Sequence, residues 1–125
     1  MTESNEFPYV TRMEARFGAL EVIDVQRLAD DCTDSWYNET LCQVNASVVR
    51  VGVLQGEYHW HHHDEEDEFF YVVEGQLLVD LEGGTVELNP RQAFVVPRGI
   101  RHRTRAPRRS IVLMVESSSI IPTGS

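Results

Sequence analysis

Lysine is missing from this chain of 125 residues, in which all eleven basic residues are arginine. Twenty acidic residues give a formal net charge of −9, and a chain with this excess of acid is not expected to bind nucleic acid. Long hydrophobic runs are also missing, which argues against a transmembrane helix, and we expect no membrane partner. The first residues, MTESNEF, are polar and acidic, unlike a secretory signal peptide, so we expect a cytoplasmic protein.

Cysteine is scarce, with Cys32 and Cys42 as the two examples. Their spacing matches neither a CxxC redox pair nor a zinc knuckle. We expect two reduced thiols in a reducing compartment, and a disulfide only if the fold brings the two residues together.

Helix signals are few and lie in the first forty residues. The pattern there predicts an edge strand at 7–10, a short strand at 19–25, one or two helical turns at 26–32 and a turn-rich connector at 33–38.

From residue 41 onward the pattern predicts β-structure, because valine-rich segments alternate with turn residues. The expected strands are 41–44, 47–54, 68–75, 76–81, 85–88, 93–97, 101–105 and 110–116. Short strands at such spacing are typical of an all-β sandwich or barrel. We divide the chain into an N-terminal extension with edge strand and short helix packing on the barrel (1–40), a β-barrel (41–118) and a C-terminal tail (119–125).

The stretch YHWHHHDEEDEFF, residues 58–70, holds four of the five histidines. Alternate side chains of an extended strand share a face, so His59, His61 and His63 should point the same way. Two imidazoles at this spacing converge on one point above the strand, as ligands of a divalent metal do.

Two more ligands are expected from other strands. Glu68 shares the inward face of the next strand with apolar residues, where an unpaired carboxylate would be costly. His102, the fifth histidine, follows a turn marked by proline and glycine and can reach the same place in a barrel. We therefore predict a metal site made of His61, His63, Glu68 and His102.

The remaining polar residues of this stretch have simpler explanations. Tyr58, Trp60 and His62 are expected on the opposite face of the strand. The acids at 64–67 are expected to form a solvated turn whose field attracts cations. Two interpretations of His59 stay open: a pocket residue that serves as acid or base, or a merely half-buried side chain.

Two segments, GEYHWHHHDEEDEFFYVVEG and FVVPRGIRH, resemble the two sequence motifs of the cupin superfamily. The matching residues are Gly56, His61, His63, Glu68, Gly75, Pro97, Gly99 and His102. More narrowly, the chain is similar to small single-domain cupins of the mannose-6-phosphate isomerase-like group, a label that describes a fold and not an activity. The resemblance implies a jelly-roll barrel (double-stranded β-helix), often a homodimer, with a metal inside on the same four residues.

The chain departs from the family pattern at three places. The spacer between Gly56 and His61 is one residue short, Arg91 stands where a glycine is usual, and Ala106 stands where an asparagine is usual. None of these is a metal ligand, but Arg91 puts the usual turn conformation in question.

Three histidines and one carboxylate leave two open positions on a six-coordinate ion and suit Fe(II), Mn(II), Ni(II) or Zn(II). Such a site fits a small metal-dependent enzyme of dioxygenase (oxidoreductase), isomerase or lyase type that acts on a small polar or anionic metabolite. It also fits a non-catalytic module that binds or senses a sugar or another small molecule, or a metal-stabilised structural domain. Phe70, Phe94 and Met114 are expected to line a small, rather apolar pocket.

The basic run RGIRHRTRAPRR, residues 98–109, allows two interpretations. It is either a solvated strand and loop that offset the acids elsewhere, or a rim that faces an anionic ligand. Arg101 and Arg103 should point away from His102 by strand alternation, which weakens the second interpretation.

Overall fold

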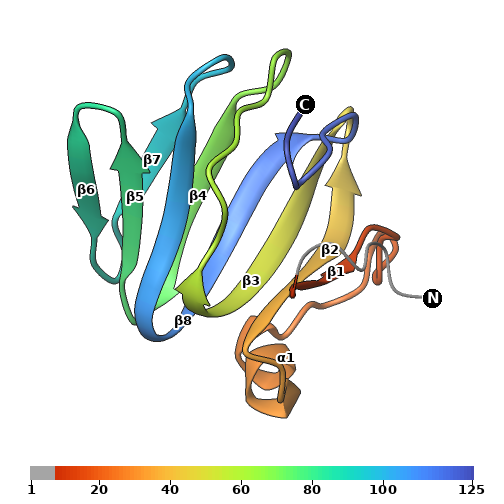
Figure 1. Cartoon of the computed structure of the whole chain (residues 1–125). Helices are drawn as coiled ribbons and strands as arrows, with labels where there is room; N and C mark the ends of the chain where they lie inside the picture. Colours follow the sequence, from red (N-terminus) through yellow and green to blue (C-terminus); the bar gives the residue numbers. More distant parts are fainter. Residues whose placement is uncertain (1–7) are drawn as a thin grey trace.

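The computed structural model describes residues 8–125, which form eight strands and one short helix (Figure 1). In chain order the elements are β1 (Val10–Arg12), α1 (Val25–Asp31), β2 (Trp36–Val44), β3 (Ser47–Glu57), β4 (Glu68–Glu74), β5 (Leu77–Leu81), β6 (Gly84–Leu88), β7 (Ala93–Val96) and β8 (His102–Ser117). Within this part of the chain, no helix has the length and apolar character needed to cross a membrane.

The strands form one sheet in the order β1-β2-β3-β8-β4-β7, to which β5 and β6 are attached through β8. The long strand β8 makes this possible because its two halves have different neighbours. Residues 102–105 pair with β5, and residues 111–116 pair with β4, while β3 lies along most of the other edge. In Figure 1 the first half of β8 lies beside β5 and the second half passes between β4 and β3. This is the jelly-roll barrel that the sequence predicts.

Apolar side chains form two cores, one on each side of the β2-β3-β8 layer. The inner core fills the barrel, and its largest members are Trp36, Tyr58, Phe70 and Met114. The outer core lies under α1, where Ala29 packs with residues of β2, β3 and β8. Strand β3 contributes to both cores, because alternate side chains of a strand point to opposite faces.

The N-terminal forty residues differ in part from the expectation. The helix at 26–32 is confirmed as α1, which begins one residue earlier and is capped by Asp24, whose carboxylate accepts a 3.1 Å hydrogen bond from the Arg27 amide. The strand expected at 19–25 is wrong, because the segment is irregular and Leu20 and Val22 are exposed. The connector expected at 33–38 is also wrong, since β2 begins at Trp36.

The edge strand exists as β1, which pairs in parallel with β2 at the end of the sheet. It lies later in the chain than the segment 7–10, and residue 7 itself lies outside the described residues. Cys32 and Cys42 are both free thiols, as expected.

The two strands expected at 101–105 and 110–116 are a single strand, β8. The sequence between them contains Pro107, a residue that cannot donate a backbone hydrogen bond to a neighbouring strand. The ladder is irregular between Leu54 and Gly56 on the neighbouring strand, so β8 continues through this point with a local shift of register. Arg91 adopts the left-handed conformation (φ 69°) that a glycine would take more easily, and its amide donates to the Val72 carbonyl at 2.7 Å.

Candidate metal centre

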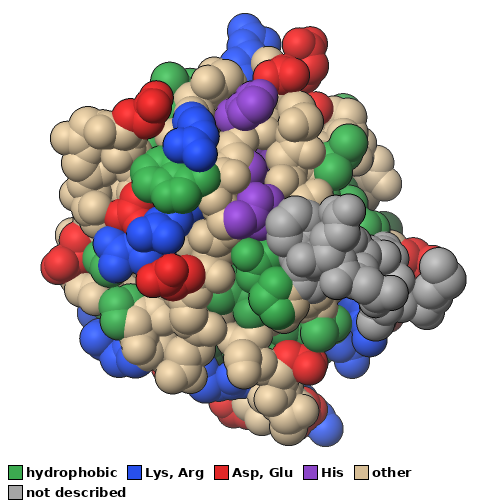
Figure 2. All heavy atoms as spheres, in the orientation of Figure 1, with side chains coloured by type: hydrophobic (Ala, Val, Ile, Leu, Met, Phe, Trp, Pro, Cys, Tyr) green, Lys and Arg blue, Asp and Glu red, His purple; other side chains and the backbone are tan. Residues whose placement is uncertain are grey.

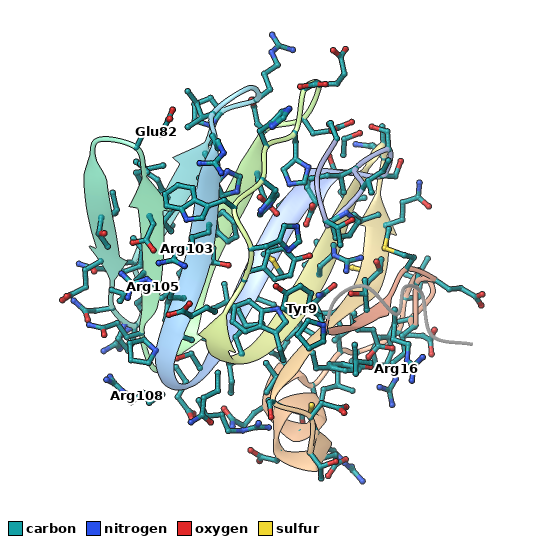
Figure 3. The ribbon with its side chains drawn as sticks, viewed as in Figure 1. Tyr9, Arg16, Glu82, Arg103, Arg105 and Arg108 are labelled. Atoms are coloured by element: carbon teal, nitrogen blue, oxygen red, sulfur yellow. The ribbon has the colours of Figure 1, made fainter. Side chains whose placement is uncertain are left out.

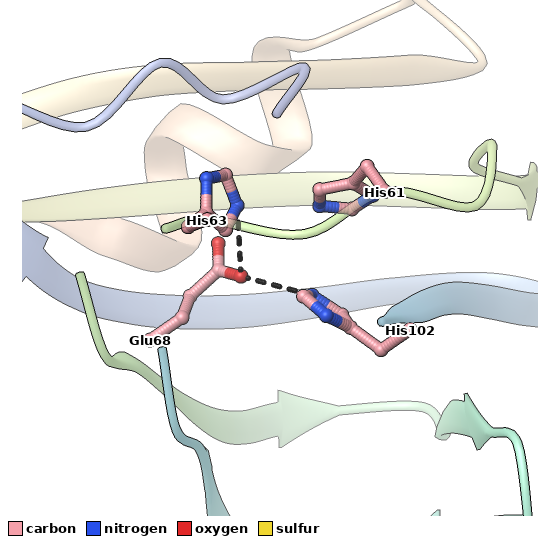
Figure 4. A group of neighbouring side chains, drawn as sticks. All are labelled: His61, His63, Glu68 and His102. Carbon is pink, nitrogen blue, oxygen red and sulfur yellow. Dashed lines mark hydrogen bonds and ion pairs between the residues drawn. The ribbon is translucent and has the colours of Figure 1, made fainter. Parts of the chain in front are cut away.

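The four predicted ligands come from three separate segments and meet inside the barrel (Figure 4). Glu68 is the first residue of β4, and His102 is the first residue of β8. His61 lies in the extended segment between β3 and β4, where it forms an isolated antiparallel bridge with His102, with both backbone hydrogen bonds at 2.9 Å. The backbone of His63 is held by the Gly99 amide, which donates to its carbonyl at 2.7 Å.

All four side chains are buried, and each offers one ligand atom such that these atoms lie within 4.8 Å of one another. His102 Nε2 is 3.2 Å and His63 Nε2 is 3.5 Å from the same oxygen of Glu68. The sequence therefore identified a group of residues that the fold does bring together.

Backbone carbonyls orient two of the imidazoles. The His61 Nδ1 atom lies 2.9 Å from the carbonyl oxygen of His59, and the His102 Nδ1 atom lies 2.9 Å from that of Ile100. A carbonyl can only accept, so each Nδ1 carries a proton, and Nε2 is the ring atom that faces the centre of the group and would coordinate a metal. This arrangement fixes the tautomer that a metal needs.

The charges of the group also favour a cation. Burial lowers the pKa of His61 to about 4, so its imidazole is neutral at physiological pH. Burial opposes the ionisation of Glu68, but the adjacent His102 and His63 outweigh it and lower the Glu68 pKa to about 2. The group thus combines an ionised Glu68 carboxylate with a neutral imidazole at His61.

The donor set fits a divalent transition metal. Both ring nitrogens of His63 are buried and make no hydrogen bond among residues 8–125, although Nε2 lies 3.5 Å from the Glu68 carboxylate. An unpartnered buried polar atom costs roughly 1–3 kcal/mol, and coordination of Nε2 to a metal would remove that cost for one of the two nitrogens. Three nitrogens and one oxygen suit iron, manganese, nickel or zinc, and the geometry does not choose among them.

A cavity of about 40 Å³ opens beside the metal group. Its walls include the apolar side chains Trp36, Leu54, Phe70, Met114 and Pro122 and the polar side chains Asn38, Arg50, Tyr58, Thr104 and Glu116, together with His61, Glu68 and His102. Phe70 and Met114 thus lie where the sequence placed them. Phe94 packs against the inner core and is not among these lining residues.

The orientation expected for Tyr58 is wrong. The regular strand β3 ends at Glu57, and beyond it strict alternation no longer holds, so Tyr58 turns into the barrel with 7% of its surface exposed. Its ring stacks on Tyr9 and Trp36, with centroid distances of 4.2 and 5.5 Å, and meets the edge of His61 at 5.2 Å.

Sequence reasoning also missed an ion pair inside the barrel. Arg50 of β3 is fully buried, donates to the side chains of Asn38 and Thr40, and has its Nε atom 3.7 Å from Glu116 Oε1 of β8. The available signal was an arginine in the middle of the valine-rich run SVVRVGVL, where a charged side chain needs a buried partner. Burial and the nearby charge of Glu68 raise the pKa of Glu116 to about 8, although Arg50 opposes this shift.

His59 lies at the edge of the site rather than among the residues that line the cavity. Its Nε2 atom is 2.8 Å from the carbonyl oxygen of Thr123, and its Nδ1 atom is 3.3 Å from the Tyr9 hydroxyl (Tyr9 is labelled in Figure 3). His59 therefore contacts the segment that follows β8.

This last segment covers one side of the metal group. Ile120 is buried, Pro122 forms part of the cavity wall, and the Ser125 amide donates to the His62 carbonyl at 2.9 Å. Gly124 packs on His61 so closely that an added Cβ would lie 2.9 Å from the Cβ of that histidine. In Figure 1 the same segment returns across the top of β3.

The residues expected to be bystanders lie at the surface. His62 is partly exposed and lies 3.0 Å from the carboxylate of Asp64, and the acids at 64, 65 and 67 are exposed. In the basic run, the guanidinium groups of Arg101 and Arg103 lie over the Trp60 ring at 4.9 and 5.5 Å.

Arginines of the basic run also pair with acids. Arg103 and Arg105 lie side by side in Figure 3, and both bind Asp80. Figure 2 shows arginine and acidic side chains next to one another on this face. The run therefore offsets acids, in agreement with the first of its two interpretations.

The family model described as a cupin domain matches residues 48–116, more than half of the chain. This chain belongs to the cupin family. The uncharacterised protein YdbB of Bacillus subtilis is 39% identical to it over 90 residues, which cover 71% of this chain and 80% of that protein.

Solved structures of other proteins have the same fold. A cupin-2 domain containing protein from Shewanella frigidimarina matches with a TM-score of 0.73 and 24% identity, over 77% of this chain and 94% of that one. KdgF from a Halomonas species matches with a TM-score of 0.63 and 25% identity, over 72% and 86% of the two chains. In this cupin, the three histidines and the glutamate among the residues that match the two family motifs form the buried His-His-Glu-His group.

Proposed function

We propose that this cupin is a metal-dependent enzyme that acts on a small polar or anionic metabolite. The observation that carries the proposal is the buried group of three histidines and one glutamate next to a small cavity lined by unpartnered polar atoms. Perturbed and buried polar groups that converge on a cavity are typical of active sites.

The residues His61, His63, Glu68 and His102 would hold one divalent ion of iron, manganese, nickel or zinc. The bound ion would supply Lewis-acid or redox chemistry at its open positions, as in an oxidoreductase of dioxygenase type, an isomerase or a lyase. The protein's own contribution is to orient the ligand against the apolar walls Phe70 and Met114 and to limit the access of water. His59 is proposed as a residue that affects activity or ligand affinity and not as a ligand.

Elemental analysis of protein purified without added metal tests the first part of the proposal. About one divalent transition ion per chain is expected, and substrate screens should then use that ion. Oxygen consumption identifies the dioxygenase class, and NMR of product mixtures detects isomerase or lyase turnover. Tight binding of a metabolite with no turnover would instead favour a binding or sensing module.

The finer grouping with mannose-6-phosphate isomerase-like cupins, the cytoplasmic location and the homodimer are further proposals. An apolar strip on the outer face of the sheet supports the dimer: Phe69 pairs with Val95 on one side and with Val115 on the other, and both valines are exposed. Light scattering of the wild-type protein and of Val115→Glu tests this, because a dimer through this face should dissociate on substitution.

A further inference from the structure

Two polar atoms beside the metal group lack any hydrogen-bond partner among the described residues. They are the hydroxyl oxygen of Tyr58 and Oε2 of Glu116, and both residues line the cavity and are more than nine-tenths buried. Buried polar groups in native proteins are almost always hydrogen-bonded, so two orphans on one small cavity indicate a missing partner.

Neither side chain is free to turn elsewhere. The Tyr58 ring is stacked against Tyr9 and Trp36, and Glu116 is kept near Arg50, whose other nitrogens are bonded to β2 side chains. The two orphan atoms are thus fixed in place before any ligand arrives, which is how a binding site achieves selectivity at low entropic cost.

We propose that Tyr58 and Glu116 form a subsite for a hydroxyl group, and that the ligand of this cupin is a small hydroxy acid. The inference rests on the proposed function for one end of the ligand, where the carboxylate would meet the metal group. The other end is assigned by the chemistry of the two orphan atoms.

A hydroxyl is the group that satisfies both atoms at once. A hydroxyl has one donor site and two acceptor sites. The ligand hydroxyl can therefore accept a hydrogen bond from the Tyr58 phenol and donate one to the ionised carboxylate of Glu116. If the Glu116 carboxyl group is protonated, the ligand hydroxyl accepts from it instead. A second carboxylate on the ligand fits less well, since the charge of Arg50 is already opposed by Glu116. Tyr58 and Glu116 therefore discriminate by hydrogen bonding and not by net charge.

The rest of the cavity limits the size and the character of the ligand. The walls Trp36, Phe70 and Met114 are apolar and suit a short hydrocarbon body between the two polar ends. A volume of about 40 Å³ admits a molecule of only a few non-hydrogen atoms unless the Pro122 wall moves.

The test compares acids that differ by one hydroxyl. Zinc-loaded protein is titrated calorimetrically with 3-hydroxypropanoate against propanoate, and with 4-hydroxybutanoate against butanoate. At least one hydroxy acid should bind about tenfold or more tightly than its parent, because a site built around a hydroxyl rejects the analogue that lacks it. If neither hydroxy acid binds more tightly than its parent acid, the inference is overturned. It is also overturned if none of the four acids binds.

Two phenylalanine variants identify the residue responsible. Tyr58→Phe should reduce the hydroxyl preference to less than about threefold. Tyr9→Phe is the matched control, because it removes a hydroxyl from the ring stacked directly on Tyr58 but not from the cavity wall, and it should keep the preference. Retention of the preference in Tyr58→Phe contradicts the proposal.

Two further measurements separate a failed subsite from a failed metal site. Zinc content should remain at one ion per chain in Tyr58→Phe, and the variant should melt no earlier than wild type without ligand, since the deleted hydroxyl has no partner. If the wild-type chain takes up no zinc, the proposed function fails. The same titrations of metal-free protein then decide the subsite, where the hydroxyl preference should persist at lower affinity.

Discussion

Gly124 lies directly against His61, with space for a hydrogen but not for a methyl group between them. The last residues of the chain thus set the position of a candidate metal ligand that precedes them by more than sixty residues. Gly124 also has a φ of 108°, a conformation that an L-amino acid with a side chain rarely adopts.

Substitution of Gly124→Ala should therefore weaken metal binding. The new methyl group would push His61 away or lift the last segment, and we expect metal affinity to fall by about tenfold or more, as for other changes that act on the orientation of a ligand. Competition with a chromophoric chelator measures this. Gly83→Ala is the control, because an added Cβ at residue 83 meets nothing within 4 Å, and its affinity should match wild type.

His61→Ala and His102→Ala should each lose the metal while the fold is retained. Each removes one of the four donors, and we expect affinity to drop by more than about 100-fold. Elemental analysis after dialysis, with circular dichroism as the check on folding, measures the effect. His62→Ala is the control, because it also replaces a histidine by alanine but at a partly exposed position outside the metal group. This variant should keep a full complement of metal. Undiminished metal in the first two variants would remove these residues from the site.

Glu116 should make the metal-free protein less stable as the pH rises from about 5 to about 8. Its pKa in the folded state is raised to about 8, above the ordinary value of 4.5, so the folded state holds the proton more tightly than the unfolded state over this interval. The Glu116 contribution is complete at low pH and is lost as the pH approaches 8, by at most about 1.4 kcal/mol per pH unit.

Glu116→Gln should flatten this dependence, since glutamine does not titrate. Thermal denaturation of metal-free protein between pH 6 and pH 8 compares the two proteins, with Glu82→Gln at an exposed turn as the control (Glu82 is labelled in Figure 3). Parallel curves for wild type and Glu116→Gln would show that ionisation of Glu116 does not limit stability.

Among the carboxylates near β5, Asp80 should contribute most to the stability of the fold. It is buried and accepts hydrogen bonds from Arg105, Arg103 and Thr85, and the bonds from Arg105 hold its pKa well below the usual range. Asp80→Asn should lower the free energy of unfolding in urea by about 2 kcal/mol at neutral pH. Glu57→Gln, which breaks a solvent-exposed pair with Arg103, should change it by less than about 1 kcal/mol.

The difference between wild type and Asp80→Asn should itself depend on pH. The folded-state pKa of Asp80 lies below the ordinary 3.8, so its contribution is present above about pH 4 and is lost as the pH falls below that value. A difference that stays constant down to pH 2 would contradict this assignment.

Much of the fold could be predicted because its signals are local. Valine-rich segments bounded by turn residues gave β3 to β7 approximately, and the helical pattern at 26–32 gave α1 to within one residue. The errors fell where a local signal competed with tertiary pairing. Trp36 looked like part of a turn but begins β2. Pro107 lies within β8, where residues 107–109 bulge opposite Gln55 of β3.

The sequence by itself determined the four candidate ligands, because histidines spaced by two residues and a carboxylate in an apolar strand have few other uses. The tertiary structure alone decided what surrounds them. Tyr58 turns inward where the regular strand ends, Arg50 meets Glu116 across two strands, and Gly124 closes over His61. These contacts join residues far apart in the chain, and strand periodicity carries no information about side chains beyond the end of a strand or about partners on another one.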